Sequence, residues 1–581
     1  MNFAAISHRC AFTDTYALDE NRVVVNLRTG KEIQNVNLIH DDPYAGGATG
    51  HMAWDGKPEP MAVSRELEHH LIWTLVLEPR FKREQYYFEI SDGQTTVLLF
   101  EDGFYSPEEA HKTGRLKQYF KFPWLNPADV IAPPAWVNDT VWYQIMPDRF
   151  CRGGDAPKRF GLRKWEDHKH IRFWDMYGGD LKGITSKLEY IRDLGITGIY
   201  MLPLFLSNSN HKYNIFDYDT IDPDFGTEED LVELVEKAHS LGIRVMVDAV
   251  FNHSGTEFAP WKDVMKNGPA SEYWDWFFVG KWPQPKLPGN TEDGRFMSFA
   301  FTSMMPKLNT NNPEVIEYFR QRCERWVREW GIDGIRFDVG NEVSHRFLKQ
   351  LNAGLKAINP DLFLLGEIWH DSAQWLQGDE YDSVMNYPFL ECLHNFWLDA
   401  QTSRDLMHAL NRCWTLYPEQ TNAALFNFLD THDTMRIRTR CGKLDVFYQQ
   451  LAMLMTLPGS PCIYYGTEIA LAGGDDPDCR RPMPWHRIEN GKCDKELAET
   501  KALIALRKAH PQLRAGHLRW VHDPKFPRLV RYSCHVKGMP QVTVSINAGN
   551  TPVPITEGTV LYSRHLSKKT LLPGGILITQ A

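Results

Sequence analysis

Strand-like apolar segments alternate with amphipathic helical stretches between residues 139 and 510. In the stretch 313–331 the apolar side chains recur at helical spacing, and 228–242 has the same character. Eight strands that each lead into a helix predict an α/β fold, a (β/α)8 TIM barrel with a parallel sheet. The eight predicted strands are 140–147, 198–204, 243–251, 331–339, 362–369, 382–387, 424–430 and 460–466.

The chain between the third and fourth predicted strands is much longer than an ordinary strand–helix connection. It is rich in Trp, Pro and Gly over 261–308. We therefore expect a subdomain inserted after strand 3, at about 252–310, beside the mouth of the barrel.

The two ends of the chain consist of short β-branched and aromatic runs that Gly, Asp and Pro interrupt. At the N-terminus they predict a β-sandwich, followed by a linker at 120–137 with four prolines. At the C-terminus they predict a small antiparallel β domain. The N-terminal runs are 22–27, 70–77, 85–90 and 95–100, and the expected domains are 1–123, the barrel at 124–510, and 511–581.

Composition and charge exclude several classes of protein. Lys plus Arg is 64 and Asp plus Glu is 74, so the formal net charge of −10 disfavours nucleic-acid binding. No apolar run is long enough to cross a membrane, and the start, MNFAAISHRC, lacks the features of a secretory signal. We expect a cytoplasmic protein with reduced cysteines and no zinc site at Cys462, Cys479 and Cys493.

Acidic residues end four of the eight predicted strands, at the face where a barrel of this type places its active site. A single acid there is more often a helix cap or a solvated charge. Four acids that converge on one mouth repel each other, which favours a functional site over a structural one. The acids are Asp248, Asp338, Glu367 and Asp433, with His253, Arg336 and His432 close by in sequence.

The neighbours of these acids indicate different roles. Arg336 and Asp338 share one face of a strand, so the guanidinium is expected to keep Asp338 ionised as a nucleophile, a structural ion pair being the alternative. Glu367 follows an apolar run, which disfavours its charged form and suits a general acid. Asp433 and His432 could hold sugar hydroxyls. A nucleophile and an acid roughly 5–5.5 Å apart are what a retaining glycosidase uses.

The segments around these acids resemble the four ordered signature motifs of the α-amylase superfamily, glycoside hydrolase family 13. They are DAVFNH (248–253), GIRFDVGNE (334–342), GEIW (366–369) and FLDTHD (428–433). MPKLN (305–309) resembles the segment that marks the cyclomaltodextrinase, neopullulanase and maltogenic amylase group. The resemblance covers nearly the whole chain, although the first 120 residues match only by their β-rich pattern and their position before the barrel.

This resemblance implies roles for individual residues. Asp338 would be the nucleophile, Glu367 the acid/base and Asp433 the transition-state stabiliser. Tyr213 would stack under the sugar, and Trp369 and His370 would touch the leaving side. The full implied set of sugar-binding residues is Tyr213, Asp248, His253, Arg336, Trp369, His370, His432, Asp476 and Arg480.

Two segments depart from the family pattern. The loop after the first strand, 151–160, lacks the Asn/Asp-rich calcium sequence and keeps Asp155 and Asp180, whereas calcium takes six to eight oxygen ligands. We therefore expect no required cofactor and no metal site, with calcium binding left open. Asn214 stands where relatives often have Asp, which is expected to change a supporting hydrogen bond rather than the chemistry.

Three functions remain open from the sequence. The resemblance implies a retaining hydrolase that cleaves α-1,4 bonds of cyclodextrins, maltodextrins and pullulan through a covalent glucosyl-aspartate, with α-1,6 activity undecided. A transglycosylase would share that intermediate. A non-catalytic relative, a binding or transporter-partner subunit, is disfavoured because all three catalytic acids are present. By the same resemblance, the N-terminal sandwich implies a homodimer with a confined cleft, the alternative being a starch-binding module on a monomer.

Overall fold

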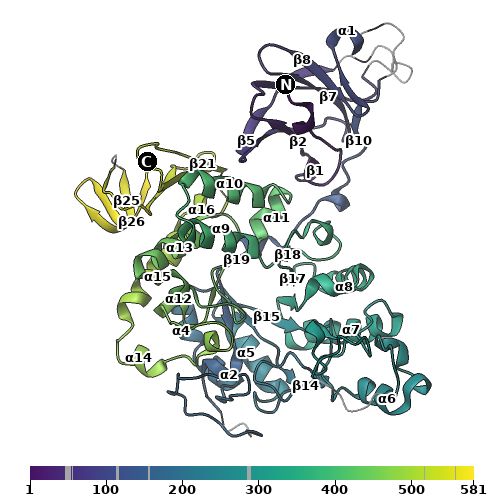
Figure 1. Cartoon of the computed structure of the whole chain (residues 1–581), viewed down its shortest axis with the longest axis vertical. Coiled ribbons are helices and arrows are strands. Elements are labelled where there is room, and N and C mark those ends of the chain that lie inside the picture. Colours follow the sequence, from purple (N-terminus) through teal and green to yellow (C-terminus); the bar gives the residue numbers. More distant parts are fainter. Residues whose placement is uncertain are drawn as a thin grey trace. The chain divides into compact units, whose positions relative to one another are not determined.

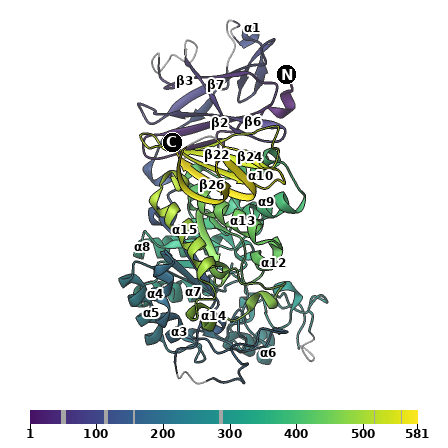
Figure 2. The ribbon, with the colours of Figure 1, turned by 90° about the vertical axis from the view of Figure 1, so that its left-hand side faces the viewer.

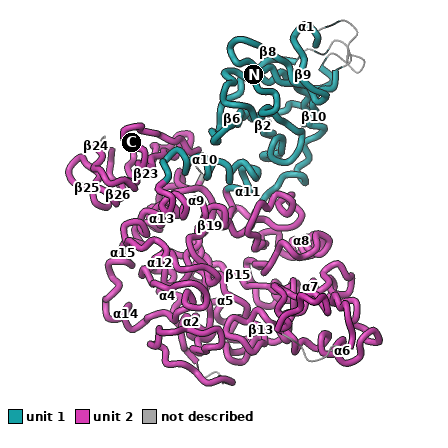
Figure 3. The backbone as a smooth tube through the Cα atoms, viewed as in Figure 1, with its two compact units in different colours: residues 1–132, 401–422 teal, residues 133–400, 423–581 magenta. Residues whose placement is uncertain are grey.

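The computed structural model describes residues 1–581 except 46–53, 55, 111, 113–116, 155–157, 284–288, 516 and 556–557. The described chain forms two compact units, coloured separately in Figure 3. The first contains residues 1–132 and 401–422, and the second contains 133–400 and 423–581. The domain boundaries expected from the sequence, near 123 and 510, stay predictions.

Eight parallel strands form the central sheet of the second unit. A parallel bridge between Met385 and Phe426 joins the two ends of the sheet, so the barrel is nearly closed. Every predicted barrel strand is confirmed, and so is the fold class. In the order β18-β17-β16-β15-β12-β11-β20-β19, the strands are Ser383–Val384, Phe363–Gly366, Gly334–Phe337, Arg244–Ala249, Gly198–Met201, Trp142–Ile145, Ser460–Tyr464 and Phe426–Phe428.

Helices surround the barrel strands (Figure 1), which explains why the strands are almost continuously apolar rather than alternating. Trp142, Tyr200, Met246 and Phe363 belong to one cluster inside the barrel. The larger helices of this unit are α5 (Glu228–Ser240), α6 (Ala259–Asn267), α7 (Pro313–Arg325), α8 (His345–Ile358), α9 (Tyr387–Leu398), α13 (Leu444–Thr456) and α15 (Asp494–Ala509).

Local sequence signals set the ends of the predicted helices. Thr227 and Asp230 form a capping box at the start of α5. Helix α7 continues through a π-helical turn, Trp326–Trp330, and stops at Gly331, whose φ of 66° lies in the left-handed region. Glycine adopts that conformation without a steric penalty, so the chain can turn there into β16.

The insertion after β15 packs around its own aromatic cluster. Trp261 of α6 lies 4.9 Å from Phe277 and 4.8 Å from Phe296 between ring centroids. Isolated bridges join His253 to Lys307 and Phe277 to Leu308, so the MPKLN segment runs beside the end of the third barrel strand. The predicted subdomain therefore lies next to the strand end that carries Asp248.

The N-terminal unit contains two antiparallel sheets, which share a core made of side chains from both. The linker prediction at 120–137 is wrong at its start, because Phe120–Phe122 forms strand β10 and pairs with β7. The buried ring of Phe120 stacks on Tyr86 at 5.6 Å, which holds this segment in the core. The sheets are β1-β2-β6-β5 (Thr15–Ala17, Val23–Gly30, His70–Leu77, Ala62–Glu66) and β4-β3-β7-β8-β9 (Lys57–Pro60, Asn35–Asp41, Glu84–Ser91, Thr96–Phe100, Gly103–Tyr105).

Helices α10 (Ser403–Trp414) and α11 (Glu419–Ala424) follow α9 in the chain, and α10 packs against β5 in the first unit. Arg404 Nη2 and Asn411 Nδ2 donate to Glu66 at its side chain and backbone carbonyl, each at 2.9 Å. This contact explains why residues 401–422 cluster with the N-terminal sheets, although they lie between two barrel strands in sequence.

The C-terminal residues form one antiparallel sheet, as the sequence predicts, and Figure 2 shows it beside α15. It packs on α13 and α15 of the barrel unit, where Gln449 donates to the carbonyl of Asn547 at 2.8 Å. None of the described helices combines the length and apolarity needed to cross a membrane. The strands are β21 (His517–Trp520), β22 (Leu529–His535), β23 (Val542–Asn547), β24 (Val553–Pro554), β25 (Thr559–Ser567) and β26 (Thr570–Gln580).

Candidate active site

The acids predicted from the sequence meet at the carboxyl ends of the barrel strands. Asp248 lies near the end of β15, and Asp338 and Glu367 directly follow β16 and β17. All three carboxylates contact one guanidinium, that of Arg336, which is completely buried. Parallel strands that are neighbours in the sheet place their carboxyl ends side by side, which is why residues so distant in sequence converge here.

Arg336 connects the two predicted catalytic residues. Its Nη1 donates to both oxygens of Asp248 and to Oδ1 of Asp338, each at 3.0 Å. Its Nη2 lies 2.7 Å from Oε1 of Glu367. Asp338 and Glu367 therefore face the two arms of the same guanidinium.

The surroundings of the pair differ from those expected from the sequence. One guanidinium is shared by three carboxylates, so it does not by itself hold Asp338 ionised. Burial raises the pKa of Asp338 well above its ordinary value, Arg336 opposes that rise, and Glu367 and Asp248 add to it. Glu367 follows an apolar strand as predicted, yet its own side chain lies against Arg336 and the backbone N–H of Val339.

The backbone after Asp338 has an unusual conformation. Val339 adopts φ 47° and ψ 45°, in the left-handed region, which is a steric outlier for a β-branched residue. In this conformation its N–H donates to Oε2 of Glu367 at 3.0 Å. Strain of this kind costs about 1–3 kcal/mol and persists where surrounding contacts over-determine the local geometry.

Asp248 joins the pair to a buried network of aromatic side chains. The hydroxyls of Tyr200 and Tyr213 donate to its Oδ2 at 2.6 and 2.8 Å. The Tyr213 hydroxyl also lies 2.8 Å from Nε2 of His432, and the two rings stack at 5.4 Å. Gln144 of β11 contacts the other nitrogen of His432 at 2.9 Å.

Asp433 lies at the other end of this network, next to His432. Its Oδ2 lies 3.1 Å from Nε2 of His432, and Nη2 of Arg480 donates to its Oδ1 at 3.1 Å. Arg480 Nε lies 2.8 Å from Oδ1 of Asp476, so the two acids share that guanidinium. Burial raises the pKa of Asp476 to about 6, against the opposing effect of Arg480. The structure thus brings both predicted members of the 476–480 pair to Asp433.

Two buried histidines of the site are neutral. Burial lowers the pKa of His253 to about 3 and that of His432 well below its ordinary value. His253 Nε2 has no hydrogen-bond partner among the described residues, and its ring stacks on Phe299 at 5.1 Å. A neutral imidazole with a free nitrogen can donate to or accept from a sugar hydroxyl.

The residues after Glu367 extend outward. Trp369 is 49% exposed, stacks on Tyr387 at 3.8 Å and points its Nε1 toward Glu367 Oε1 at 3.4 Å. His370 is exposed and its Nδ1 contacts the carbonyl of Asp371 at 2.9 Å. Trp369 therefore offers an open aromatic edge beside Glu367, whereas the ring nitrogen of His370 is engaged within its own loop.

Three residues of the network were not predicted. Gln144, Tyr200 and Tyr387 contact His432, Asp248 and Glu367, respectively. A polar signal was present for one of them, because Gln144 is the single amide inside a strongly apolar strand. The two tyrosines gave no such signal, since aromatic residues also fill barrel cores.

Asn214, the other departure from the family pattern, accepts from the hydroxyls of Ser207 and Ser209 at 2.7 and 2.6 Å. Its Nδ2 donates to Oδ1 of Asn208 at 2.7 Å. A carboxylate at this position could not make the second bond, because it carries no donor when ionised.

No group of three or more His, Cys, Asp or Glu side chains in the described part of the chain is arranged to hold a metal ion. Asp155, one of the two acids that the sequence retained for calcium, lies outside the described residues. The other, Asp180, caps helix α3 (Leu181–Ser186) through the N–H of Gly183 at 2.8 Å. Gly153, Gly154 and Lys158 also donate to its carboxylate, so Asp180 has no lone pair left for a calcium ion.

A parallel eight-stranded barrel with clustered carboxylates and a buried arginine at the carboxyl ends of its strands has the architecture of a glycoside hydrolase. The family described as "Alpha amylase, catalytic domain" matches residues 144–497, and "Alpha amylase, N-terminal ig-like domain" matches 1–126. The chain therefore belongs to the α-amylase family, glycoside hydrolase family 13.

Similar proteins cover almost the whole chain. A cyclomaltodextrinase of Geobacillus thermopakistaniensis (strain MAS1) is 42% identical over 571 residues, 96% of this chain and 93% of that protein. Neopullulanase 2 of Thermoactinomyces vulgaris is 37% identical over 92% of this chain and 89% of its own length. A solved structure named cyclomaltodextrinase matches with a TM-score of 0.89 and 34% identity, over 100% of this chain and 98% of that one.

Proposed function

We propose that the protein is a retaining α-glucan hydrolase of the cyclodextrin-degrading type, with Asp338 as nucleophile, Glu367 as acid/base and Asp433 as transition-state stabiliser. The observation that carries this proposal is the contact of one buried guanidinium with both Asp338 and Glu367. Arg336 holds the two carboxyls beside each other, and the proposed reaction uses Asp338 as the carboxylate and Glu367 as the acid.

The reaction has two steps. The Asp338 carboxylate attacks the anomeric carbon while Glu367 gives its proton to the departing glycosidic oxygen, so one C–O bond forms and one breaks. Glu367, now a carboxylate, then takes a proton from water, whose oxygen attacks the same carbon and releases Asp338. Positive charge that develops on the sugar ring is stabilised by the Asp433 carboxylate. A second sugar in place of water gives transglycosylation.

Substrate binding uses the groups that line the reacting pair. We assign His253, His432 and Asp248 to bonding hydroxyls of the sugar in the cleaved position, and the unpartnered Nε2 of His253 supports this assignment. The ring of Tyr213 offers a stacking face. The half-exposed indole of Trp369 is suited to the leaving side of the substrate.

The names of the relatives support cyclodextrins, maltodextrins and pullulan as substrates. Initial rates on β-cyclodextrin, pullulan and soluble starch, with products identified over time, test this proposal. We expect a higher rate on β-cyclodextrin than on soluble starch, with transfer products that appear early and are later hydrolysed. A protein that turns over none of the three would instead be a non-catalytic relative.

We further propose a homodimer formed through the N-terminal unit and a cytoplasmic location. A relative from Bacillus subtilis, 41% identical over 90% of this chain, is named an intracellular maltogenic amylase, which supports the location. Light scattering across a range of concentrations tests the dimer. A constant mass near that of one 67.2 kDa chain would contradict it.

A further inference from the structure

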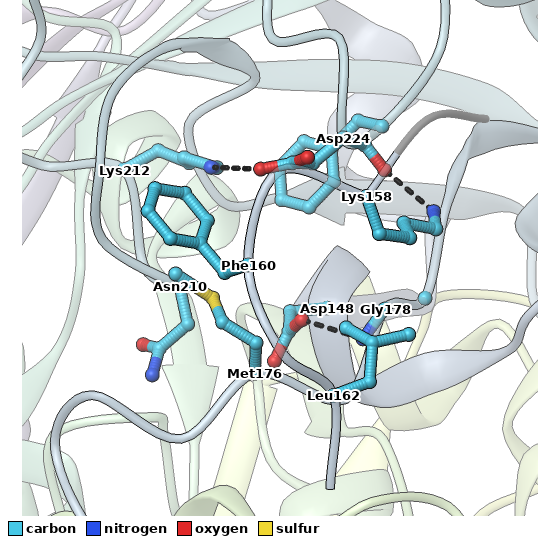
Figure 4. A pocket seen from close by; sticks show the side chains of 11 residues that line it. Asp148, Lys158, Phe160, Leu162, Met176, Gly178, Asn210, Lys212 and Asp224 are labelled. Carbon is cyan, nitrogen blue, oxygen red and sulfur yellow. Dashed lines mark hydrogen bonds and ion pairs between the residues drawn. The ribbon is translucent and has the colours of Figure 1, made fainter.

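Two loops at the carboxyl end of the barrel meet in a compact ion cluster outside the proposed active site. One loop follows β11 and the other follows β12. The cluster consists of three cations, Lys158, Arg159 and Lys212, and three carboxylates, Asp180, Asp222 and Asp224. Figure 4 shows Lys158, Lys212 and Asp224 around the adjoining cavity.

Asp180 is fully occupied by donors of its own chain. The N–H groups of Gly153 and Gly183 donate to its Oδ1 at 3.0 and 2.8 Å. The N–H of Gly154 and the ammonium of Lys158 donate to its Oδ2, each at 3.2 Å. Two carboxylate oxygens have about four acceptor positions, so this set leaves none for a metal ion.

The same ammonium reaches the second loop. Lys158 Nζ donates to the backbone carbonyl of Asp224 at 2.7 Å and thereby joins a carboxylate of one loop to a carbonyl of the other. A carboxylate and a backbone carbonyl are the oxygen ligands that calcium takes in proteins, and here one lysine bonds both.

The other two cations satisfy the remaining carboxylates. Arg159 Nη2 donates to Asp222 at 2.6 Å and to Asp224 at 2.9 Å. Lys212 is 1% exposed and its Nζ lies 2.8 Å from Asp222. Burial lowers the pKa of Lys212, and the carboxylate of Asp222 limits that fall.

The charges of the cluster are balanced without a metal. Among the described residues of the cluster, three cations face three carboxylates, so a divalent ion would add two uncompensated positive charges to a mostly buried site, at a large desolvation cost. The adjoining cavity measures about 10 Å³, and its walls include apolar side chains such as Phe160, Leu162 and Met176 beside Lys158 and Lys212. Such a volume is about the minimum for one water molecule.

We propose that Lys158 is a built-in replacement for a calcium ion at this loop, and that the protein therefore needs no divalent cation for stability. The proposal does not rest on the assigned catalytic roles, because it concerns unfolding rather than turnover. The lysine clamps the β11 loop to the loop that also carries Tyr213.

Thermal unfolding of the full chain tests the proposal directly. The wild-type Tm should agree within about 1 °C between excess EDTA and about 1 mM calcium chloride, the weak end of protein calcium sites. Metal analysis of the untreated protein should find far less than one calcium per chain. A Tm that falls in EDTA and recovers with calcium would overturn the proposal.

A variant tests the lysine itself. Lys158→Met should lower the Tm by at least about 3 °C in EDTA and calcium alike, since it leaves Asp180 without its counter-cation. The matched control is Lys164→Met, an exposed lysine of the same loop, which should leave the Tm unchanged. Equal Tm values for the two variants would also overturn the proposal. If Lys158→Met does not fold, the comparison of the wild-type Tm in EDTA and in calcium decides the question.

Discussion

Replacing Asp338 by Asn should abolish activity and at the same time stabilise the protein. Asp338 is one of three carboxylates around the single guanidinium of Arg336, and it is 7% exposed. Two negative charges of this group are therefore uncompensated when all three carboxyls are ionised. The Asn side chain has nearly the same shape and removes one of those charges.

The magnitude follows from the raised pKa of Asp338. The pKa of Asp338 is higher in the folded state than in the unfolded state. Its favourable contribution to the free energy of unfolding is therefore complete below about pH 4 and is lost as the pH rises through the folded pKa. Each unit of that rise corresponds to about 1.4 kcal/mol of unfolding free energy at higher pH. The free energy of unfolding of the variant should therefore equal that of wild type near pH 4. Near pH 8 it should be larger by at least about 1 kcal/mol.

Calorimetric Tm values across this pH range, with initial rates on β-cyclodextrin, measure both effects. We expect the Tm difference to grow with pH and turnover to fall on the order of 10⁴-fold or more. The control is Asp361→Asn, an exposed acid before β17, which should change neither quantity. A variant less stable than wild type at pH 8, or one that keeps a tenth of the activity, would refute this reasoning.

Three further predictions concern the same site. Glu367→Gln should lose turnover of cyclodextrin. It should still release an activated leaving group such as 4-nitrophenol in a burst, because that group departs without a proton from an acid. Absence of the burst would contradict the role of Glu367 as an acid. Tyr213→Phe removes the hydroxyl that bonds Asp248 and His432 and should lower kcat/KM about tenfold, whereas an unchanged value would show that the network is dispensable. Asp476 has a pKa raised to about 6, so its contribution to stability is lost as the pH rises through that value. The Tm of Asp476→Asn should therefore increase relative to that of wild type between pH 4 and 7. A relative decrease in Tm would contradict the raised pKa.

Much of the fold was predictable because a barrel strand buried on both faces leaves a strong local signal. Segments such as 243–251 and 362–369 are apolar over their whole length, and the strands β15 and β17 lie within them. The linker at 120–137 was partly misassigned, because its prolines obscured the strand Phe120–Phe122. What holds that strand in place is the long-range stacking of Phe120 on Tyr86, which no local pattern reveals.

The identities of the site residues were also predictable, since acids at the ends of successive parallel strands must meet at one face. Their environments were not. The sequence placed Arg336 beside Asp338 alone, two residues away on one strand. The barrel brings Asp248 and Glu367 to the same guanidinium from neighbouring strands, and so changes which charges the arginine must balance.

The sequence by itself determined the order of the elements, the barrel and the acids at its mouth, because hydrophobic period and strand ends are local properties of a chain. Only the tertiary structure decided how charge is shared: three carboxylates on Arg336, a left-handed Val339 that donates to Glu367, and Lys158 bonded to Asp180. The physical reason is that electrostatic interactions depend on distance and burial, and both arise from strands and loops far apart in the chain.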